Sequence, residues 1–238
     1  LTEREKDIIA LVGLLHDIGH GPMSHFFDEY LKRTETEIPR THEERSILIF
    51  ERMVTKYEIQ LTQKEVEYIS KSIKNPSKEN WYNYLVCNTF YHLDTDKLDY
   101  LVRDSYYVGY RVGFDVNRIL NNTIMKENKL FLSMKVKYDI EKLFLQREEM
   151  HRCIYGHKTC LKFQSYLLEK LRRKNLSIKN IEDFVMWTDE KLLCVILDES
   201  ERELFETRGF FEQTSNKKVL TYSKDNQRKE ALENIEWI

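Results

Sequence analysis

Glycine and proline are scarce in this sequence, with only 7 glycines and 3 prolines among 238 residues. Because these residues form tight turns and end helices, their scarcity favours long elements over a fold built from many short strands. Cysteine is scarce as well, and the 4 cysteines form neither a C-x-x-C pair nor a disulfide-like framework. Such cysteine usage favours a reducing, intracellular compartment, either nuclear or cytoplasmic.

The sequence also lacks a strong net charge and a long apolar run. A formal net charge of −2 argues against nucleic-acid binding through a globally basic surface, although a local basic pocket is compatible with it. No segment approaches the ~18 apolar residues of a membrane span. No secretory signal opens the chain, and because it begins with Leu1 we expect further residues upstream.

The residues that are present predict a folded and mostly helical protein. Charged residues make up 33% of the chain and aromatic residues 12%, a globular composition. Capping boxes at residues 2–5 and 62–65 mark two helix starts. The longer predicted elements are helices over 41–57, 62–73, 138–173 and 178–197, the last with a break near Thr188, and a hairpin over 123–136. We therefore expect a mostly α fold with one or two small β-ribbons.

A histidine-rich stretch at residues 11–25 stands out in the first part of the chain. An apolar helical run ends at His16-Asp17, glycines and a proline stop the helix, and His20 and His25 follow within nine residues. A single histidine beside a single aspartate is common and usually carries no function. Three histidines and an aspartate within ten residues, held at the end of a buried helix, are instead typical of a metal site with nitrogen and oxygen ligands.

Two further segments carry charged and polar side chains at helical spacing. Residues 93–104 hold four aspartates, a lysine, an arginine and a tyrosine. A solvated helix face is the ordinary explanation of such a run. Arg147, His151 and Tyr155 follow at strict i, i+4 spacing, and alone they are equally compatible with a structural role.

The order and spacing of these blocks resemble the HD-domain phosphohydrolases. More narrowly, they are similar to the deoxynucleoside triphosphate triphosphohydrolases of the type joined to a SAM domain in animals. The resemblance covers residues 8 to about 160 and extends more loosely to residues 188–205. The matching blocks are His16-Asp17, the Gly-His-Gly-Pro-x-Ser-His run at 19–25, Thr41-His42-Glu43, and Asp94-x-Asp96-Lys97-x-Asp99-Tyr100-x-x-Arg103-Asp104.

The resemblance implies one divalent metal ion at the catalytic centre. In that family four residues hold the metal, and His16, Asp17 and Asp96 match three of them. The fourth, a histidine, is expected upstream of Leu1, and His92 is the only nearby substitute in this chain. Mixed histidine and carboxylate ligation leaves Fe, Mn, Zn, Ni and Mg open.

The resemblance also implies roles around the substrate. Its catalytic histidines gather round the α-phosphate, and two carboxylates orient them. These residues are His20, His25 and His42, with Asp28 and Glu43 as the carboxylates. The implied substrate contacts are Lys97 and Arg147 at the phosphates, Tyr100, Asp104 and Tyr155 at the deoxyribose, and His151 near the base and sugar. Asp104 would lie at the 3′-hydroxyl and Tyr155 would crowd the 2′ position.

The resemblance further implies regulation by a bound nucleotide. The nucleotide would be GTP or a dNTP with Mg²⁺, bound between the subunits of a dimer or tetramer. The positions that match such a site are Arg118, Lys135, Lys137, His157 and Lys158. Asp139 departs from the family, which usually has an amide there. The alternative is that Arg118 and the lysines are solvated surface charges.

The function implied by the resemblance is hydrolysis of a deoxynucleoside triphosphate, as a dGTPase-like enzyme, to deoxynucleoside and inorganic triphosphate. One alternative is another HD phosphohydrolase acting on nucleoside monophosphates or cyclic nucleotides. A second is a catalytically silent protein that binds nucleotides or single-stranded nucleic acid. We expect an HD core over residues 1–175, with its N-terminal part upstream of Leu1, and a helical extension over residues 176–238 packed on that core.

Overall fold

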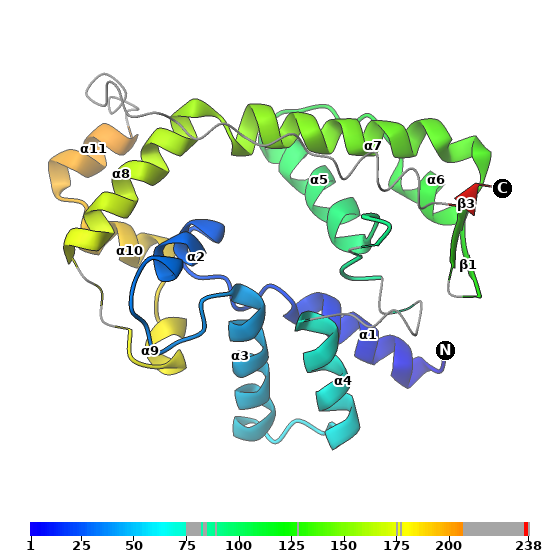
Figure 1. Cartoon of the computed structure of the whole chain (residues 1–238), viewed down its shortest axis with the longest axis horizontal. Coiled ribbons are helices and arrows are strands. Elements are labelled where there is room, and N and C mark those ends of the chain that lie inside the picture. The colour runs from blue at the N-terminus through cyan, green and yellow to red at the C-terminus, as the bar shows by residue number, and fades with distance from the viewer. Residues whose placement is uncertain are drawn as a thin grey trace. The chain divides into compact units, whose positions relative to one another are not determined.

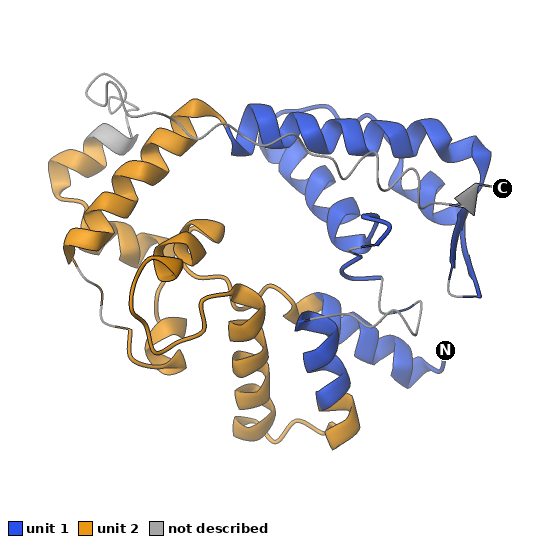
Figure 2. Ribbon diagram, in the orientation of Figure 1, with its two compact units in different colours: residues 1–13, 67–156, 222–238 blue, residues 14–66, 157–221 orange. Residues whose placement is uncertain are grey.

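The computed structural model describes residues 1–74, 82, 85–88, 90–127, 129–174, 176 and 178–206, together with the backbone of residues 236–237. Helices dominate the described residues, as the sequence predicts (Figure 1). Within these ranges no helix is long and apolar enough to cross a membrane. The chain divides into two compact units, residues 1–13, 67–156 and 222–238 in unit 1 and residues 14–66 and 157–221 in unit 2 (Figure 2).

The described residues of unit 2 form helices joined by turns and loops, with no strand among them. Its complete helices are α2 (His25–Lys32), α3 (His42–Lys56), α8 (Lys158–Lys174), α9 (Ile181–Val185), α10 (Asp189–Ile196) and α11 (Glu199–Glu206). Helix α8 packs against both α2 and α10, and α9 packs against α3. Phe27, Leu167, Leu171 and Leu192 are fully buried at the centre of its core. This core fixes α2 and α3, whose first residues carry histidines.

Unit 1 combines helices with a small sheet. Its complete elements are α5 (Thr95–Tyr107), α6 (Val116–Asn121), β1 (Thr123–Lys126), β2 (Lys129–Leu132), the 3₁₀ turn η2 (Met134–Val136), α7 (Lys137–Met150), the π-helix η3 (His151–Tyr155) and β3 (Glu236–Trp237). Strand β2 lies between β1, its antiparallel hairpin partner, and β3, which runs parallel to it. Helix α5 packs against α7. The predicted mostly α fold with a small β-ribbon is confirmed.

Side-chain caps account for several helix starts. Thr2 and Glu5 form the predicted capping box before α1 (Glu3–Leu15), with Oε2 of Glu5 accepting from the Thr2 backbone N–H at 2.7 Å. The second predicted capping box opens α4 (Gln63–Lys74) in the same way. Thr188 caps α10 by accepting from the Lys191 N–H, which confirms the predicted break there. Each cap satisfies N–H groups that a helix start leaves without an internal partner.

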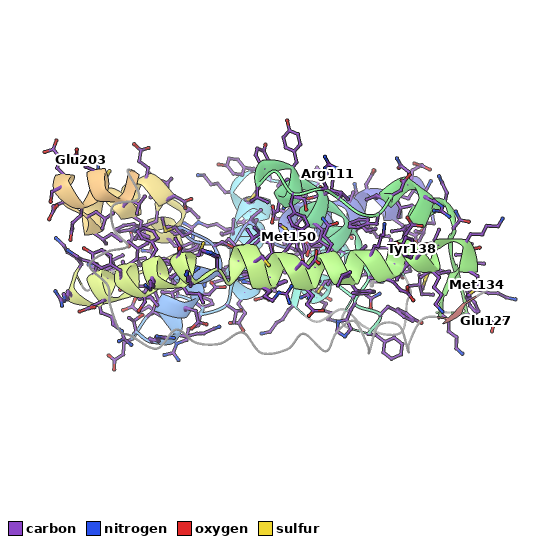
Figure 3. The ribbon with its side chains drawn as sticks, turned by 90° about the horizontal axis from the view of Figure 1, so that it is seen from above. Arg111, Glu127, Met134, Tyr138, Met150 and Glu203 are labelled. Carbon is purple, nitrogen blue, oxygen red and sulfur yellow. The ribbon has the colours of Figure 1, made fainter. Side chains whose placement is uncertain are left out.

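The predicted single helix from Tyr138 to Arg173 is wrong. Helix α7 ends at Met150, the residue labelled in Figure 3, and the chain continues as the π-helix η3. At the end of η3 the Gly156 N–H donates to the carbonyl of His151 at 2.7 Å. Helix α8 begins only at Lys158. The apolar spacing continues across the break, so periodicity alone could not reveal it. The expected division of the chain near residue 175 into a core and an extension stays a prediction.

Candidate active site

The histidine-rich stretch folds as a tight turn between α1 and α2. Helix α1 ends at Leu15, and the turn that follows is fastened to α3 through the Ser46 hydroxyl. The Gly19 N–H donates to Ser46 Oγ at 2.8 Å, and this hydroxyl donates to the His16 carbonyl at 2.7 Å. A Cβ on Gly19 would lie 2.1 Å from the carbonyl oxygen of His42, so only glycine allows this approach.

Three imidazole rings meet at the starts of α2 and α3. His20 stacks on His42 with 4.0 Å between ring centroids and an interplanar angle of 18°. The His25 ring lies edge-on to both, 4.8 Å from His20 and 5.2 Å from His42. The structure thus brings together all three histidines predicted to surround a phosphate.

Asp28 is the buried carboxylate beneath these rings. Its Oδ2 accepts from His42 Nδ1 at 2.7 Å and lies 3.8 Å from His25 Nδ1, while Oδ1 accepts from the guanidinium of Arg45. Burial would raise the pKa of Asp28, but these partners outweigh it and hold the pKa well below its ordinary value. In return, Asp28 raises the pKa of His25. The partners of Asp28 therefore favour its ionised form, and Asp28 in turn favours the protonated form of His25.

Asp17 faces the rings from the other side. One of its oxygens lies 3.5 Å from His20 Nε2 and 3.9 Å from His42 Nε2, and the other lies 3.4 Å from His16 Nε2. Burial would raise the pKa of Asp17, yet the neighbouring histidines lower it overall. The second predicted orienting carboxylate, Glu43, has Oε1 3.3 Å from His42 Nε2. Both carboxylates therefore place negative charge beside the imidazole rings.

The nitrogen and oxygen donors of unit 2 fit a divalent ion. His20, His25, Asp28 and His42 each offer a ligand atom, these atoms lie within 4.8 Å of one another, and they could hold a metal. They are the residues that the sequence assigned to catalysis. Of the residues assigned to the metal, His16 and Asp17 are neighbours in unit 2, whereas Asp96 belongs to unit 1. The convergence of His16, Asp17 and Asp96 stays a prediction.

The predicted substrate-binding residues all belong to unit 1. On α5, the Lys97 ammonium pairs with Asp94 at 2.7 Å. Asp104 accepts from the Tyr155 hydroxyl at 2.6 Å, and burial together with this bond raises the pKa of Tyr155.

Two further contacts join the remaining predicted substrate residues of this unit. The His151 ring lies edge-on to Tyr155, 5.0 Å between centroids. Burial raises the pKa of Tyr100, and a hydrogen bond with Arg147 opposes that rise. Tyr155 thus contacts Asp104 and His151, and Tyr100 contacts Arg147.

The predicted regulatory residues divide between the units. Arg118 forms an ion pair with Asp139 at 2.9 Å and donates to the Lys135 carbonyl at 2.6 Å. Lys135 and Lys137 lie in the same unit, whereas His157 and Lys158 belong to unit 2. Asp139, the departure from the family pattern, is thus the direct partner of Arg118.

Arg45 was not singled out from the sequence, yet it is the largest fully buried side chain of the described residues. The sequence does indicate that Arg45 is buried. Arg45 precedes Ile49 and Met53 by four and eight residues, so it falls on the apolar stripe of α3. A charged residue at such a position requires a buried partner. Asp28 is that partner.

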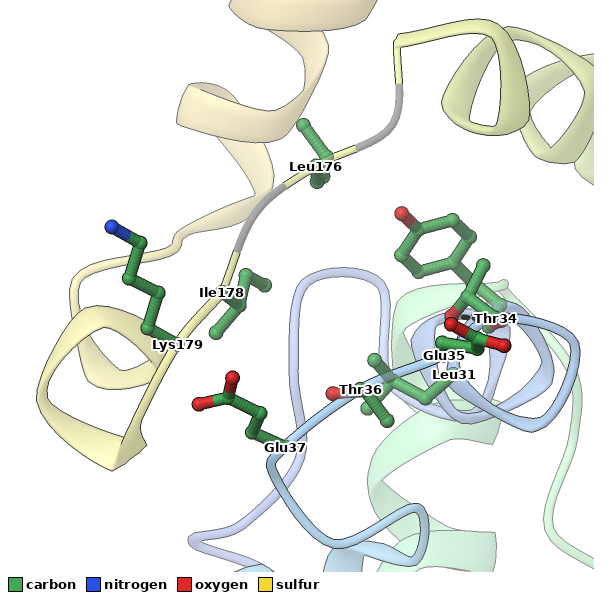
Figure 4. A pocket seen from close by; sticks show the side chains of 9 residues that line it. Leu31, Thr34, Glu35, Thr36, Glu37, Leu176, Ile178 and Lys179 are labelled. Carbon is green, nitrogen blue, oxygen red and sulfur yellow. Dashed lines mark hydrogen bonds between the residues drawn. The ribbon is translucent and has the colours of Figure 1, made fainter.

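A cavity of about 450 Å³ lies elsewhere in unit 2 (Figure 4). It is lined by the end of α2, by residues 34–37, and by Leu176, Ile178 and Lys179. The predicted site residues are not among those that line it. The cavity is therefore separate from the histidine cluster.

Comparison with known proteins gives a family match for the first part of the chain. Residues 1–103 match the family model of the HD domain. The chain carries an HD domain. This match includes the histidine cluster, Asp28 and Asp96, and it confirms the resemblance expected from the sequence.

The relatives that match are longer proteins. The HD domain is shared with an HD domain-containing protein of Acanthamoeba polyphaga mimivirus, 34% identical over 80% of this chain and 44% of that protein. The deoxynucleoside triphosphate triphosphohydrolase SAMHD1 homolog of Dictyostelium discoideum is 28% identical over 93% of this chain and 45% of its own length. Human SAMHD1, also named a deoxynucleoside triphosphate triphosphohydrolase, is 25% identical over 95% of this chain and 43% of its own length. The chain thus spans less than half the length of these relatives.

Proposed function

We propose that this HD domain acts in an intracellular enzyme that hydrolyses deoxynucleoside triphosphates to deoxynucleoside and inorganic triphosphate. The observation that carries the proposal is the cluster of three imidazoles above a buried, ionised Asp28. Similarity to proteins named deoxynucleoside triphosphate triphosphohydrolases supports the substrate class. The Lys97 and Arg147 side chains would supply further positive charge to a triphosphate.

The cluster suits the transition state of phosphate-ester hydrolysis. Negative charge grows on the phosphoryl and leaving oxygens, and protonated imidazoles stabilise it. His25 is the exposed member, with 77% of its side chain open to solvent, and Asp28 favours its protonated form. We assign His25 as the acid that protonates the leaving ester oxygen. A divalent ion held by His16, Asp17 and Asp96 would lower the pKa of a bound water and polarise a phosphoryl oxygen.

Product analysis tests the proposal. A chain extended upstream of Leu1 is incubated with each of the four dNTPs and with Fe, Mn, Zn, Ni or Mg in turn. We expect deoxynucleoside and triphosphate in equal amounts with at least one metal. Release of orthophosphate, or hydrolysis of monophosphates or cyclic nucleotides instead, would favour a different HD phosphohydrolase. Binding without any product would favour a silent nucleotide- or nucleic-acid-binding protein.

Ribonucleotides are expected to be poor substrates. The Tyr155 hydroxyl is fixed by Asp104, and the ring would occupy the space that a 2′-hydroxyl needs. Burying that hydroxyl without a partner costs about 1–3 kcal/mol, so kcat/KM for dGTP should exceed that for GTP by roughly 5- to 150-fold. Tyr155→Ala should reduce this ratio, while Tyr107→Ala, at an exposed position of α5, should leave it unchanged. Equal hydrolysis of GTP and dGTP by the parent chain would contradict the assignment.

Regulation by a bound nucleotide is a second part of the proposal. A triphosphate with Mg²⁺ held by Arg118, Lys135, Lys137, His157 and Lys158 would link nucleotide binding to assembly into a dimer or tetramer by mass action. We expect sedimentation of the extended chain to show a larger species when dGTP or GTP is added. An unchanged species, together with activity that does not rise with added nucleotide, would rule this mode out.

Asp139 gives this regulation a specific test. The carboxylate pairs with Arg118 and would repel a phosphate brought to the same guanidinium. Asp139→Asn should therefore lower the nucleotide concentration needed for assembly. Glu127→Gln, at an exposed turn of the same unit, removes one negative charge elsewhere and serves as the matched control.

A further inference from the structure

Arg45 connects three separate segments of unit 2 from a fully buried position. Its Nε donates to the Gly19 carbonyl and its Nη1 donates to the Pro39 carbonyl, each at 2.9 Å. Its Nη2 donates to Oδ1 of Asp28. The guanidinium carbon lies 5.0 Å from the centre of the Phe184 ring. Such a set of contacts desolvates the charge and restricts the guanidinium to one orientation.

The Asp28 carboxylate divides its two oxygens between different partners. Oδ1 faces Arg45, while Oδ2 accepts from His42 and approaches His25. Because a carboxylate is planar, fixing Oδ1 also fixes where Oδ2 points. An ionised Asp28 only accepts hydrogen bonds, so His42 must carry its proton on Nδ1 and expose Nε2 to Asp17 and Glu43.

We propose that Arg45 is a positioning residue of the histidine cluster. Arg45 holds Asp28 so that this carboxylate fixes the orientation and the tautomer of His42. Arg45 does not touch the reacting atoms in this assignment. It acts through Asp28, as the outer partners of reactive histidines commonly do. The contacts to Gly19 and Pro39 keep the guanidinium in place.

Two variants separate this role from a merely structural one. Arg45→Gln removes the charge, and Arg45→Lys keeps a charge for Asp28 but cannot reach all three acceptors. Arg52→Gln is the matched control, because Arg52 also lies on α3 and pairs with an acidic residue, Glu182, but on an exposed surface. Thermal unfolding measures the structural contribution of each variant.

Nitrogen-15 NMR of histidine-labelled protein reports which ring nitrogen carries the proton. At about pH 9, above the ordinary pKa of imidazole, we expect a single Nδ1–H form of His42 in the parent chain, in Arg45→Lys and in Arg52→Gln. In Arg45→Gln we expect a mixture of both forms. A single unchanged Nδ1–H form in folded Arg45→Gln would overturn the proposal. This measurement is independent of whether the proposed hydrolysis is correct.

The kinetic measurement rests on the proposed function. Arg45→Gln should lower kcat by about tenfold or more with little change in KM, a size typical of outer partners of reactive groups. Arg45→Lys should restore kcat to within about threefold of the parent despite a lower Tm. If Arg45→Gln does not fold, Arg45→Lys alone tests the proposal. A large loss of kcat in Arg45→Lys, with His42 still in its Nδ1–H form, would overturn it.

Discussion

Replacing His25 by alanine should lower the turnover of a deoxynucleoside triphosphate by about 10²-fold or more, while substrate binding changes less. This is the usual loss when a general acid or a donor to a developing oxyanion is removed. The position of His25 supports the expectation, because its ring is exposed next to His20 and His42 while Asp28 raises its pKa. A ground-state contact alone would raise KM instead.

Steady-state kinetics and equilibrium binding of a dNTP measure the two effects separately. Lys32→Ala is a suitable control, because Lys32 ends the same helix and pairs with Glu29 at the surface. Near-normal turnover in the His25→Ala chain would make His25 a structural residue. A loss of binding with unchanged turnover would assign it to substrate recognition.

A second large effect is expected from Gly19→Ala, which should destabilise the fold by about 3 kcal/mol or more. The new Cβ would meet the His42 carbonyl oxygen at 2.1 Å and the Ser46 backbone nitrogen at 2.3 Å. Both atoms belong to the helix backbone of α3 and cannot turn away as a side chain could. Overpacking of this kind costs typically 1–3 kcal/mol and sometimes more.

Urea unfolding measures this loss, and Gly13→Ala provides the control. A Cβ at Gly13 would lie 3.7 Å from Val86 Cγ2, an ordinary contact, and Gly13 is in the interior of α1. Alanine is the better helix former, so Gly13→Ala should be stabilising by about 0.5–1 kcal/mol. An unfolding midpoint of Gly19→Ala equal to that of the parent would show that the turn can move away from α3.

The sequence predicts those features that depend on residues close together in the chain. The capping boxes at Thr2 and Thr62 depend on neighbours three residues away, and both are present. The grouping of His20, His25 and Asp28 likewise follows from short spacing across one turn and the start of one helix. Such features depend on local backbone geometry, which can be predicted from the spacing of residues in a single sequence.

Other features depend on contacts between distant segments, and the sequence alone does not contain them. The pairing of Arg118 with Asp139 joins α6 to α7, and the contacts of Arg45 join α3 to two separate loops. The end of α7 at Met150 is of the same kind, because the apolar pattern continues unchanged through η3. The convergence of Asp96 with His16 and Asp17 stays a prediction.

The π-helix η3 has a consequence for how the length of this chain can vary. Its hydrogen bond spans five residues, from the Gly156 N–H to His151, where an α-helix spans four. Such a segment holds one residue more than the α-helix it replaces. Removing one residue from 151–155 would therefore restore regular α-helical hydrogen bonding, because an α-helix holds one residue fewer in the same turn. Insertions and deletions of one residue are thus easier to accommodate here than elsewhere in a helix, at the cost of re-aiming Tyr155.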